Sequence, residues 1–127
     1  MKCTYCQANT KIVSGQELYP NLGLSEAVKF VACSNCDAHV MCRKNTEEPD
    51  GLLADGVLRT MRATVFSHLN PMLANKGKKA RAKVLTGMAR SVFCGQANVN
   101  AFGEGDCKRA IDYLENLRLE THGANNG

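Results

Sequence analysis

The spacing of hydrophobic positions changes at about residue 54. Before it, β-branched or alternating residues occur in the three short runs TKIVSG (10–15), AVKFVAC (27–33) and AHVMCRK (38–44). The segment YPNLGLS (19–25) places Pro and Gly between the first two runs, as in a turn. After Asp55, apolar residues recur every three or four positions, which is the spacing of a helix. The pattern therefore predicts an α+β fold in which short antiparallel strands precede helices.

Three helices are expected in the second part. The first begins after an N-cap at Asp55 and ends at Asn70-Pro71, with an apolar arc formed by Val57, Leu58, Met61, Val65 and Leu69. The second runs from about Lys78 to Phe93, and Gly87 in its middle costs it about 1 kcal/mol, so it needs tertiary packing. The third begins after an N-cap at Asp106, and its apolar face consists of Cys107, Ala110, Ile111, Leu114 and Leu117.

Four cysteines form two C-x2-C pairs, Cys3 with Cys6 and Cys33 with Cys36. Two cysteines three positions apart on a tight turn can point both sulfurs at one metal ion, and two such turns complete a tetrahedral shell. The strands between the pairs would bring the turns together, which is the arrangement of a zinc ribbon with a structural Zn²⁺. A closed shell of four thiolates leaves no open coordination position, so catalysis at the metal is not expected.

Other readings of these cysteines are an iron–sulfur site, a redox-active pair or buried thiols. Closed four-thiolate ribbons more often hold zinc than iron–sulfur. A redox-active pair normally lies at a helix N-terminus after a strand, and Cys3 leaves no room for that strand.

The remaining cysteines and histidines are expected to lie outside the metal site. His39 and Cys42 are three positions apart on a strand and so fall on opposite faces. We expect Cys42 to be a small buried side chain and His39 to lie at the surface or at a strand edge. Cys94 and Cys107 lie in the helical region, and Cys107 is expected in its core.

The predicted organisation is a zinc ribbon over residues 1–44, a connecting loop over 45–53, a helical part over 54–120 and a disordered tail over 121–127. The loop NTEEPDG is short, so we expect the ribbon to pack with the three-helix part. The chain has 127 residues, 6% aromatic residues and no Trp, which leaves a thin core that a metal would reinforce.

Composition also indicates a compartment. The seven cysteines are an odd number, and MKCTYC is not the start of a secretory signal, so we expect a cytoplasmic protein in a reducing environment. No run of apolar residues reaches membrane-spanning length.

The net charge of +4 is concentrated in the middle of the chain. Residues 56–103 contain no acidic side chain. They carry eight cations, which are the candidate nucleic-acid contacts: Arg59, Arg62, Lys76, Lys78, Lys79, Arg81, Lys83 and Arg90. Such a segment suggests a polyanionic or acidic partner, although a solvated face has the same composition. Phe66 lies beside Arg59 and Arg62 at the border of the apolar arc of the first helix, where it would stack on a nucleobase or pack on the next helix.

Several blocks of the sequence resemble a family of small zinc-finger-containing proteins found largely in bacteriophages and prophages. The blocks are CSNCDAHV (33–40), NTEEPDGLLADGVLRTMR (45–62), LNPM (69–72) and AFGEGDCKRAIDYL (101–114), so the resemblance covers most of the chain. It implies a phage-type zinc-ribbon protein in the bacterial cytoplasm and brings no settled activity. The chain departs from the family pattern at Phe66, where the family has His, at Asn70, where it has Asp, and near Leu73, where it has Trp.

Three functions are compatible with these features. The first is binding of DNA or RNA through the basic helical segment. The alternative is a phage effector that binds an acidic surface of a host protein. The third is a zinc-knuckle nuclease that uses His68 and Asn70. We expect no enzymatic activity, because His68 falls on the apolar arc and its segment has no carboxylate to bind Mg²⁺.

Overall fold

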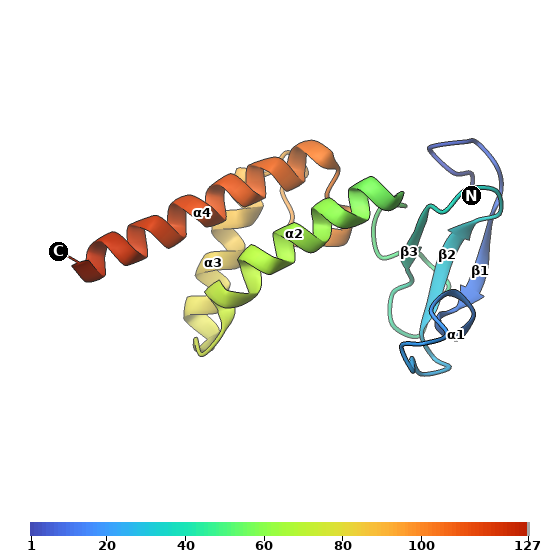
Figure 1. Cartoon of the computed structure of the whole chain (residues 1–127), viewed down its shortest axis with the longest axis horizontal. Helices are drawn as coiled ribbons and strands as arrows, with labels where there is room; N and C mark the ends of the chain where they lie inside the picture. Colours follow the sequence, from blue (N-terminus) through green and yellow to red (C-terminus); the bar gives the residue numbers. More distant parts are fainter. Residues whose placement is uncertain (127) are drawn as a thin grey trace. The chain divides into compact units, whose positions relative to one another are not determined.

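The computed structural model describes residues 1–126 and the side chains of residues 1–120. Its elements are β1 (Thr10–Ser14), α1 (Gly15–Leu18), β2 (Lys29–Cys33), β3 (His39–Met41), α2 (Gly56–Leu73), α3 (Lys78–Ser91), the 3-10 helix η1 (Val99–Ala101) and α4 (Glu104–Asn126) (Figure 1). The chain divides into two compact units, Met1–Arg59 and a second that begins at Thr60. The predicted α+β class is confirmed: a small sheet comes first and the long helices follow.

The sheet of the first unit is antiparallel, with strand order β1-β2-β3. Ile12 pairs with Val31, and Val31 pairs with Val40, so these side chains share one face. The hydrophobic core on that face consists of Cys3, Val31, Cys33, Ala38, Val40, Cys42 and Leu53. The opposite face carries Phe30 and His39, whose rings contact Tyr19 from the segment after α1. Both faces of this small sheet are therefore covered.

Residues 45–53, predicted as a connecting loop, belong to the first unit. The backbones of His39 and Ala54 exchange two hydrogen bonds of 3.1 Å, and Cys42 forms a bridge with Pro49. Leu53 is 3% exposed in the core beneath the sheet. The chain thus adds a final layer to the ribbon before α2 begins.

Helix α2 begins where the sequence predicted it but ends later. The Asp55 carboxylate accepts a hydrogen bond of 3.0 Å from the Leu58 amide, which confirms the predicted N-cap. Pro71 was expected to end the helix but lies inside it. Leu69 and Met72 are both buried, so packing on this side outweighs the hydrogen bond that Pro71 cannot donate. Val57, predicted on the apolar arc, is 61% exposed.

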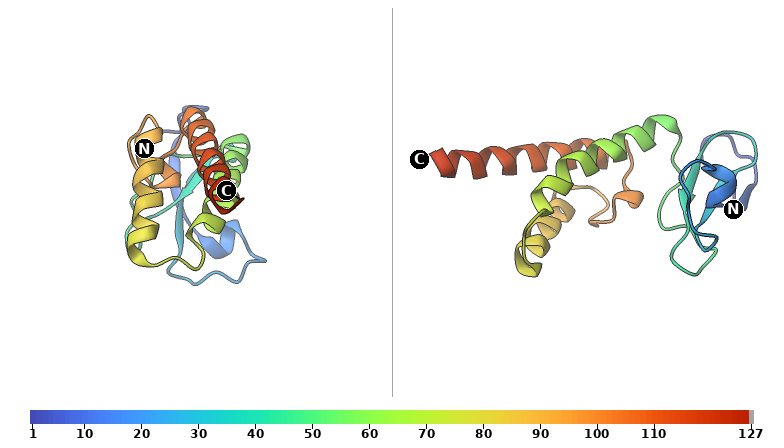
Figure 2. Two further views of the ribbon diagram at one scale, coloured as in Figure 1. Left: turned by 90° about the vertical axis from the view of Figure 1, so that its left-hand side faces the viewer. Right: turned by 60° about the horizontal axis from the view of Figure 1, so that its bottom comes forward.

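The second unit is helical, and α3 packs against α4 within it (Figure 2). Val84 and Met88 are buried on α3. Of the predicted apolar face of the third helix, Cys107, Ala110 and Leu114 are buried, whereas Ile111 and Leu117 are partly exposed. Helix α4 begins at Glu104, two residues before the predicted N-cap.

The carboxylate of Asp106, inside the first turn of α4, accepts hydrogen bonds from the amides of Gly103 and Cys94, at 3.0 and 3.1 Å. It therefore holds the segment after α3 close to the start of α4. At its other end, α4 is assigned through Asn126, so the backbone of residues 121–126 is helical where the sequence predicted a disordered tail. Gly127 lies outside the described residues.

The glycine in the middle of α3 has a packing role. A Cβ atom placed on Gly87 would lie 1.8 Å from the hydroxyl oxygen of Tyr113 on α4. The missing side chain lets Tyr113 approach the α3 backbone, so the helix propensity lost at Gly87 is exchanged for closer packing between two helices.

Candidate metal centre

Each cysteine pair lies in a tight loop closed by backbone hydrogen bonds. In the first loop the Cys3 amide donates to the Ala8 carbonyl at 2.8 Å, and the Gln7 amide donates to the Cys3 carbonyl at 2.9 Å. Gln7 has a positive φ of 65°, which turns the chain back after Cys6. In the second loop the Cys33 amide donates to the Ala38 carbonyl at 2.9 Å. These loops present both sulfurs of each pair on the same side.

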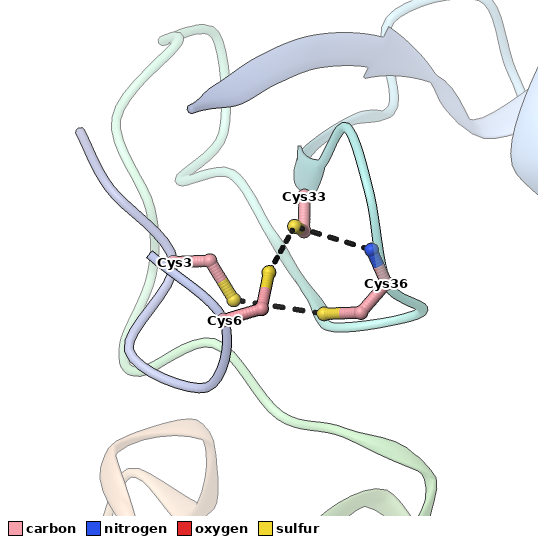
Figure 3. Close-up of side chains that lie close together, drawn as sticks. All are labelled: Cys3, Cys6, Cys33 and Cys36. Atoms are coloured by element: carbon pink, nitrogen blue, oxygen red, sulfur yellow. Dashed lines mark hydrogen bonds between the residues drawn. The ribbon is translucent and has the colours of Figure 1, made fainter. Parts of the chain in front are cut away.

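The four sulfurs converge from the two loops (Figure 3). The distance between the Sγ atoms is 3.6 Å for Cys3 and Cys36 and 3.4 Å for Cys6 and Cys33. All four Sγ atoms lie within 4.8 Å of one another. Around a tetrahedral ion with metal–sulfur bonds of about 2.3 Å, neighbouring sulfurs would lie about 3.8 Å apart. The donor set and its spacing therefore fit a metal ion at the centre.

Backbone amides around the cluster favour thiolates. The amides of Cys36 and Asn35 donate to Cys33 Sγ, both at 3.3 Å, and they lower the pKa of the Cys33 thiol to about 6. The amide of Tyr5 donates to Cys3 Sγ at 3.4 Å. These contacts orient sulfur lone pairs and partly neutralise the charge of the thiolates.

The four sulfurs cannot all ionise easily without a cation. The Ala38 amide favours the Cys36 thiolate, but desolvation and the adjacent sulfurs outweigh it and raise the pKa of this thiol to about 12. A divalent metal ion would supply the missing positive charge and bind all four thiolates, which is why metal binding and proton release are linked. The cluster is therefore built for a cation and not for four free thiols.

The other cysteines stand apart from this cluster. Within the part of the chain whose side chains are described, the four predicted ligands are the only group of three or more cysteine, histidine or acidic side chains close enough to hold a metal. Cys42 and Cys107 are buried, as predicted, and burial raises the pKa of each thiol. Cys94 is partly exposed.

His39 lies on β3, an edge strand of the three-stranded sheet, but it is buried there, so the predicted alternative of a surface position is wrong. It lies on the face of the sheet opposite to Cys42, as expected, but the segment carrying Tyr19 covers that face. Its Nδ1 lies 2.8 Å from the Asp37 carbonyl, and its Nε2 forms a short hydrogen bond with the Tyr19 hydroxyl. Desolvation lowers the pKa of His39, which favours the neutral imidazole in this covered position.

Arg59, predicted to bind nucleic acid, connects the second cysteine loop to the first turn of α2. Its guanidinium donates to the carbonyls of Asp37 and Ala54 at 2.8 Å each, and to the Asp37 carboxylate at 2.9 Å. The hydrogen bond from Arg59 lowers the pKa of Asp37. The Arg59 side chain is 31% exposed and most of its donors are occupied, so its role in this structure is to hold the loop.

Arg62 is only 5% exposed, which removes it from the surface where the sequence placed it. Its Nε and Nη2 atoms both donate to the Phe102 carbonyl, at 3.0 and 2.9 Å. The other six predicted contacts, Lys76, Lys78, Lys79, Arg81, Lys83 and Arg90, lie on α3 or just before it. Lys76 is partly exposed and the remaining five are exposed.

His68 has a carboxylate neighbour that its own segment does not supply. Its Nε2 lies 3.8 Å from a carboxylate oxygen of Glu115 on α4, and the His68 side chain is 29% exposed. Asn70 is exposed on α2. A single carboxylate beside His68 does not form a group that could hold a metal among the described residues.

No helix in the described part of the chain combines the length and apolar character needed to cross a membrane.

No curated protein matches the chain, and no solved structure does. A family described as a zinc-finger-containing domain matches residues 1–117, which include both cysteine loops and most of α4. With four convergent sulfurs inside a match over nearly the whole chain, the protein belongs to this family of zinc-finger-containing domains.

Proposed function

We propose that the cluster of Cys3, Cys6, Cys33 and Cys36 binds one structural Zn²⁺. The convergence of four sulfurs within 4.8 Å carries this proposal. Zinc suits a closed tetrahedral shell of thiolates, and such a shell has no open position for a substrate. The ion joins two loops of a small sheet whose core contains few large side chains, so it supplies folding free energy.

The test of the metal is its stoichiometry and its effect on folding. Elemental analysis of purified protein is expected to give one zinc per chain. A strong chelator is expected to reduce the sheet signal in circular dichroism. Substoichiometric metal together with an unchanged spectrum after chelation would refute a structural zinc.

We further propose that the second unit binds nucleic acid through the exposed face of α3. Lys79, Lys83 and Arg90 follow one another at helical spacing on the side of α3 away from buried Val84 and Met88. Among the described residues, none of these three cations forms an ion pair. A row of cations without acidic partners is the charge pattern that contacts phosphates.

Binding of this kind would be sensitive to salt and weakly dependent on sequence. Lysine contacts to phosphates release counterions, so affinity falls as salt concentration rises. Such contacts position a strand but do not read its bases.

The resemblance to phage and prophage proteins supports a setting in the cytoplasm of a bacterial host. The closed sulfur shell supports a binding protein and not an enzyme.

Fluorescence anisotropy with labelled duplex and single-stranded oligonucleotides, at about 50 and 200 mM salt, tests this function. Replacing Lys79, Lys83 and Arg90 by Ala is expected to weaken binding and to reduce the salt slope by about three contacts. Lys11→Ala, which removes an exposed cation of β1, is the control and is expected to leave binding unchanged. Absence of salt-sensitive binding by the unaltered protein would refute the proposal and favour an acidic protein surface as the partner.

A pull-down from bacterial lysate, with and without nuclease treatment, separates these partners. Proteins that are retained only without nuclease are bridged by nucleic acid, as proposed. Retention of one protein after nuclease treatment would support the host-protein alternative.

A further inference from the structure

The most exposed large hydrophobic side chain in the described chain is Phe93, at 75% exposure. It lies in the turn after α3, where the Gly95 amide donates to the Val92 carbonyl at 3.4 Å and Gly95 has a φ of 68°. An exposed phenylalanine forgoes the free energy that burial of its apolar ring would supply. The contacts around Phe93 therefore indicate what keeps the ring at the surface.

Two contacts hold this ring in place, and a hydrogen bond fixes one of its partners. The guanidinium of Arg109 lies over one face, 4.5 Å from the ring centroid. Arg109 is itself fixed, because its Nε donates to the Ser91 carbonyl at 2.7 Å. The edge of the ring lies against Gly105, where an added Cβ would be 3.2 Å from the ring carbon Cε2.

The backbone next to the ring is fixed as well. The Cys94 amide donates to the buried carboxylate of Asp106 at 3.1 Å. The turn is thus attached to α4 on both sides of Phe93, by Ser91 on one side and by Cys94 on the other. The side chain is therefore exposed and oriented at the same time.

We propose that Phe93, with Arg109 beneath it, is a stacking platform for an unpaired nucleobase. This inference rests on the proposed nucleic-acid binding and specifies its ligand as single-stranded DNA or RNA. An aromatic ring with one face on a guanidinium presents its other face to a base, and any base can stack there. Bases inside a duplex are stacked on each other and do not offer a free face, so the platform selects unpaired strands.

The cations around the platform suit a strand that approaches it. Arg90 is exposed in the last turn of α3, three residues before Phe93. Lys108 and Arg109 are exposed on α4. Phosphates contacted by these side chains would place the adjoining base near the ring, which joins the basic face of α3 to a site that contacts bases.

The test compares two single-stranded probes that have the same phosphates. One is a 15-nucleotide oligothymidine and the other is a 15-nucleotide strand of abasic residues, both measured by anisotropy with zinc-loaded full-length protein at about 50 mM salt. The unaltered protein is expected to bind the oligothymidine about tenfold more tightly than the abasic strand. Phe93→Leu is expected to abolish that preference while affinity for the abasic strand stays the same.

Two further variants act as controls. Phe93→Tyr keeps an aromatic ring and is expected to keep the preference. Phe66→Leu changes the other exposed phenylalanine, which is 40% exposed on α2, and is also expected to keep it. Because Phe93 is so exposed, its replacement by Leu should not disturb folding, and circular dichroism checks this.

Each other outcome has a distinct meaning. Equal, salt-sensitive binding of both probes would overturn the platform and leave the proposed function standing. No binding of either probe would overturn the platform, and it would overturn the proposed function as well if the duplex oligonucleotide is not bound either. A preference that is lost in Phe66→Leu and not in Phe93→Leu would place the stacking elsewhere. A dimer in sedimentation that Phe93→Leu converts to a monomer would show that the ring covers a second copy of the chain.

Discussion

Replacement of Arg62 by methionine gives a sharp test of the helical unit. Arg62 is 5% exposed, and its Nε and Nη2 atoms both donate to the carbonyl of Phe102, a residue with no exposed surface. Methionine keeps most of the packing of the aliphatic stem but leaves that buried carbonyl without these donors. An unsatisfied buried polar group costs about 1–3 kcal/mol, so we expect Arg62→Met to lower the free energy of unfolding by about 2 kcal/mol.

Urea denaturation of the zinc-loaded protein, followed by circular dichroism, measures this change. Arg62→Lys retains the charge and some of the donors, so we expect it to lower the free energy of unfolding by less than Arg62→Met does. Arg90→Met is the matched control, since Arg90 is exposed on α3 and its replacement is expected to change stability by less than about 0.5 kcal/mol.

The opposite pattern would refute this reasoning. If Arg62→Met were as stable as the unaltered protein but bound oligonucleotides with a reduced salt slope, the guanidinium would contact phosphate and not the Phe102 carbonyl. The sequence-based assignment of Arg62 to the nucleic-acid surface would then be restored.

Three further predictions concern the metal centre, the helix packing and the covered face of the sheet. Cys6→Ala is expected to reduce zinc content below one per chain, whereas Cys42→Ala, outside the cluster, is expected to leave it unchanged in elemental analysis. Gly87→Ala is expected to destabilise the protein by about 1–2 kcal/mol in urea denaturation because of the clash with Tyr113, and to be neutral or stabilising when Tyr113 is also Ala. The pKa of His39 is lowered by burial, so the unfolded state binds more protons below about pH 6.5, and stability should fall as pH falls through that range. His39→Gln should remove this part of the slope in denaturation curves at constant excess zinc, and an unchanged slope would contradict it.

The metal site could be predicted from sequence because its geometry is mostly local. The spacing within each cysteine pair sets the loop, and the β-branched runs between the pairs indicate the strands that bring the loops together. The core position of Cys107 follows from helical spacing in the same way.

The features that the sequence did not reveal depend on partners far along the chain. Periodicity placed Arg62 at the border of an apolar arc, but its acceptor is the carbonyl of Phe102, forty positions away. His39 is covered by Tyr19, which follows the short helix α1. The sequence around Tyr19 contains no pattern that indicates this contact. Pro71 stays in α2 because Leu69 and Met72 are buried around it. Helical spacing predicts that the second helix ends at Phe93, whereas α3 ends at Ser91, and the contacts of Phe93 with Arg109 and Gly105 on α4 are not visible in the sequence.

The way in which the ribbon ends affects how the protein can be dissected. Ala54 continues the sheet, Leu53 fills its core, and Arg59 ties the second cysteine loop to the start of α2. A fragment cut after residue 44 or 53 would lose these contacts and expose apolar surface, although both places look like a linker. An expression fragment of the metal-binding half should therefore extend through residue 59, and proteases that prefer flexible linkers should find residues 45–53 a poor target.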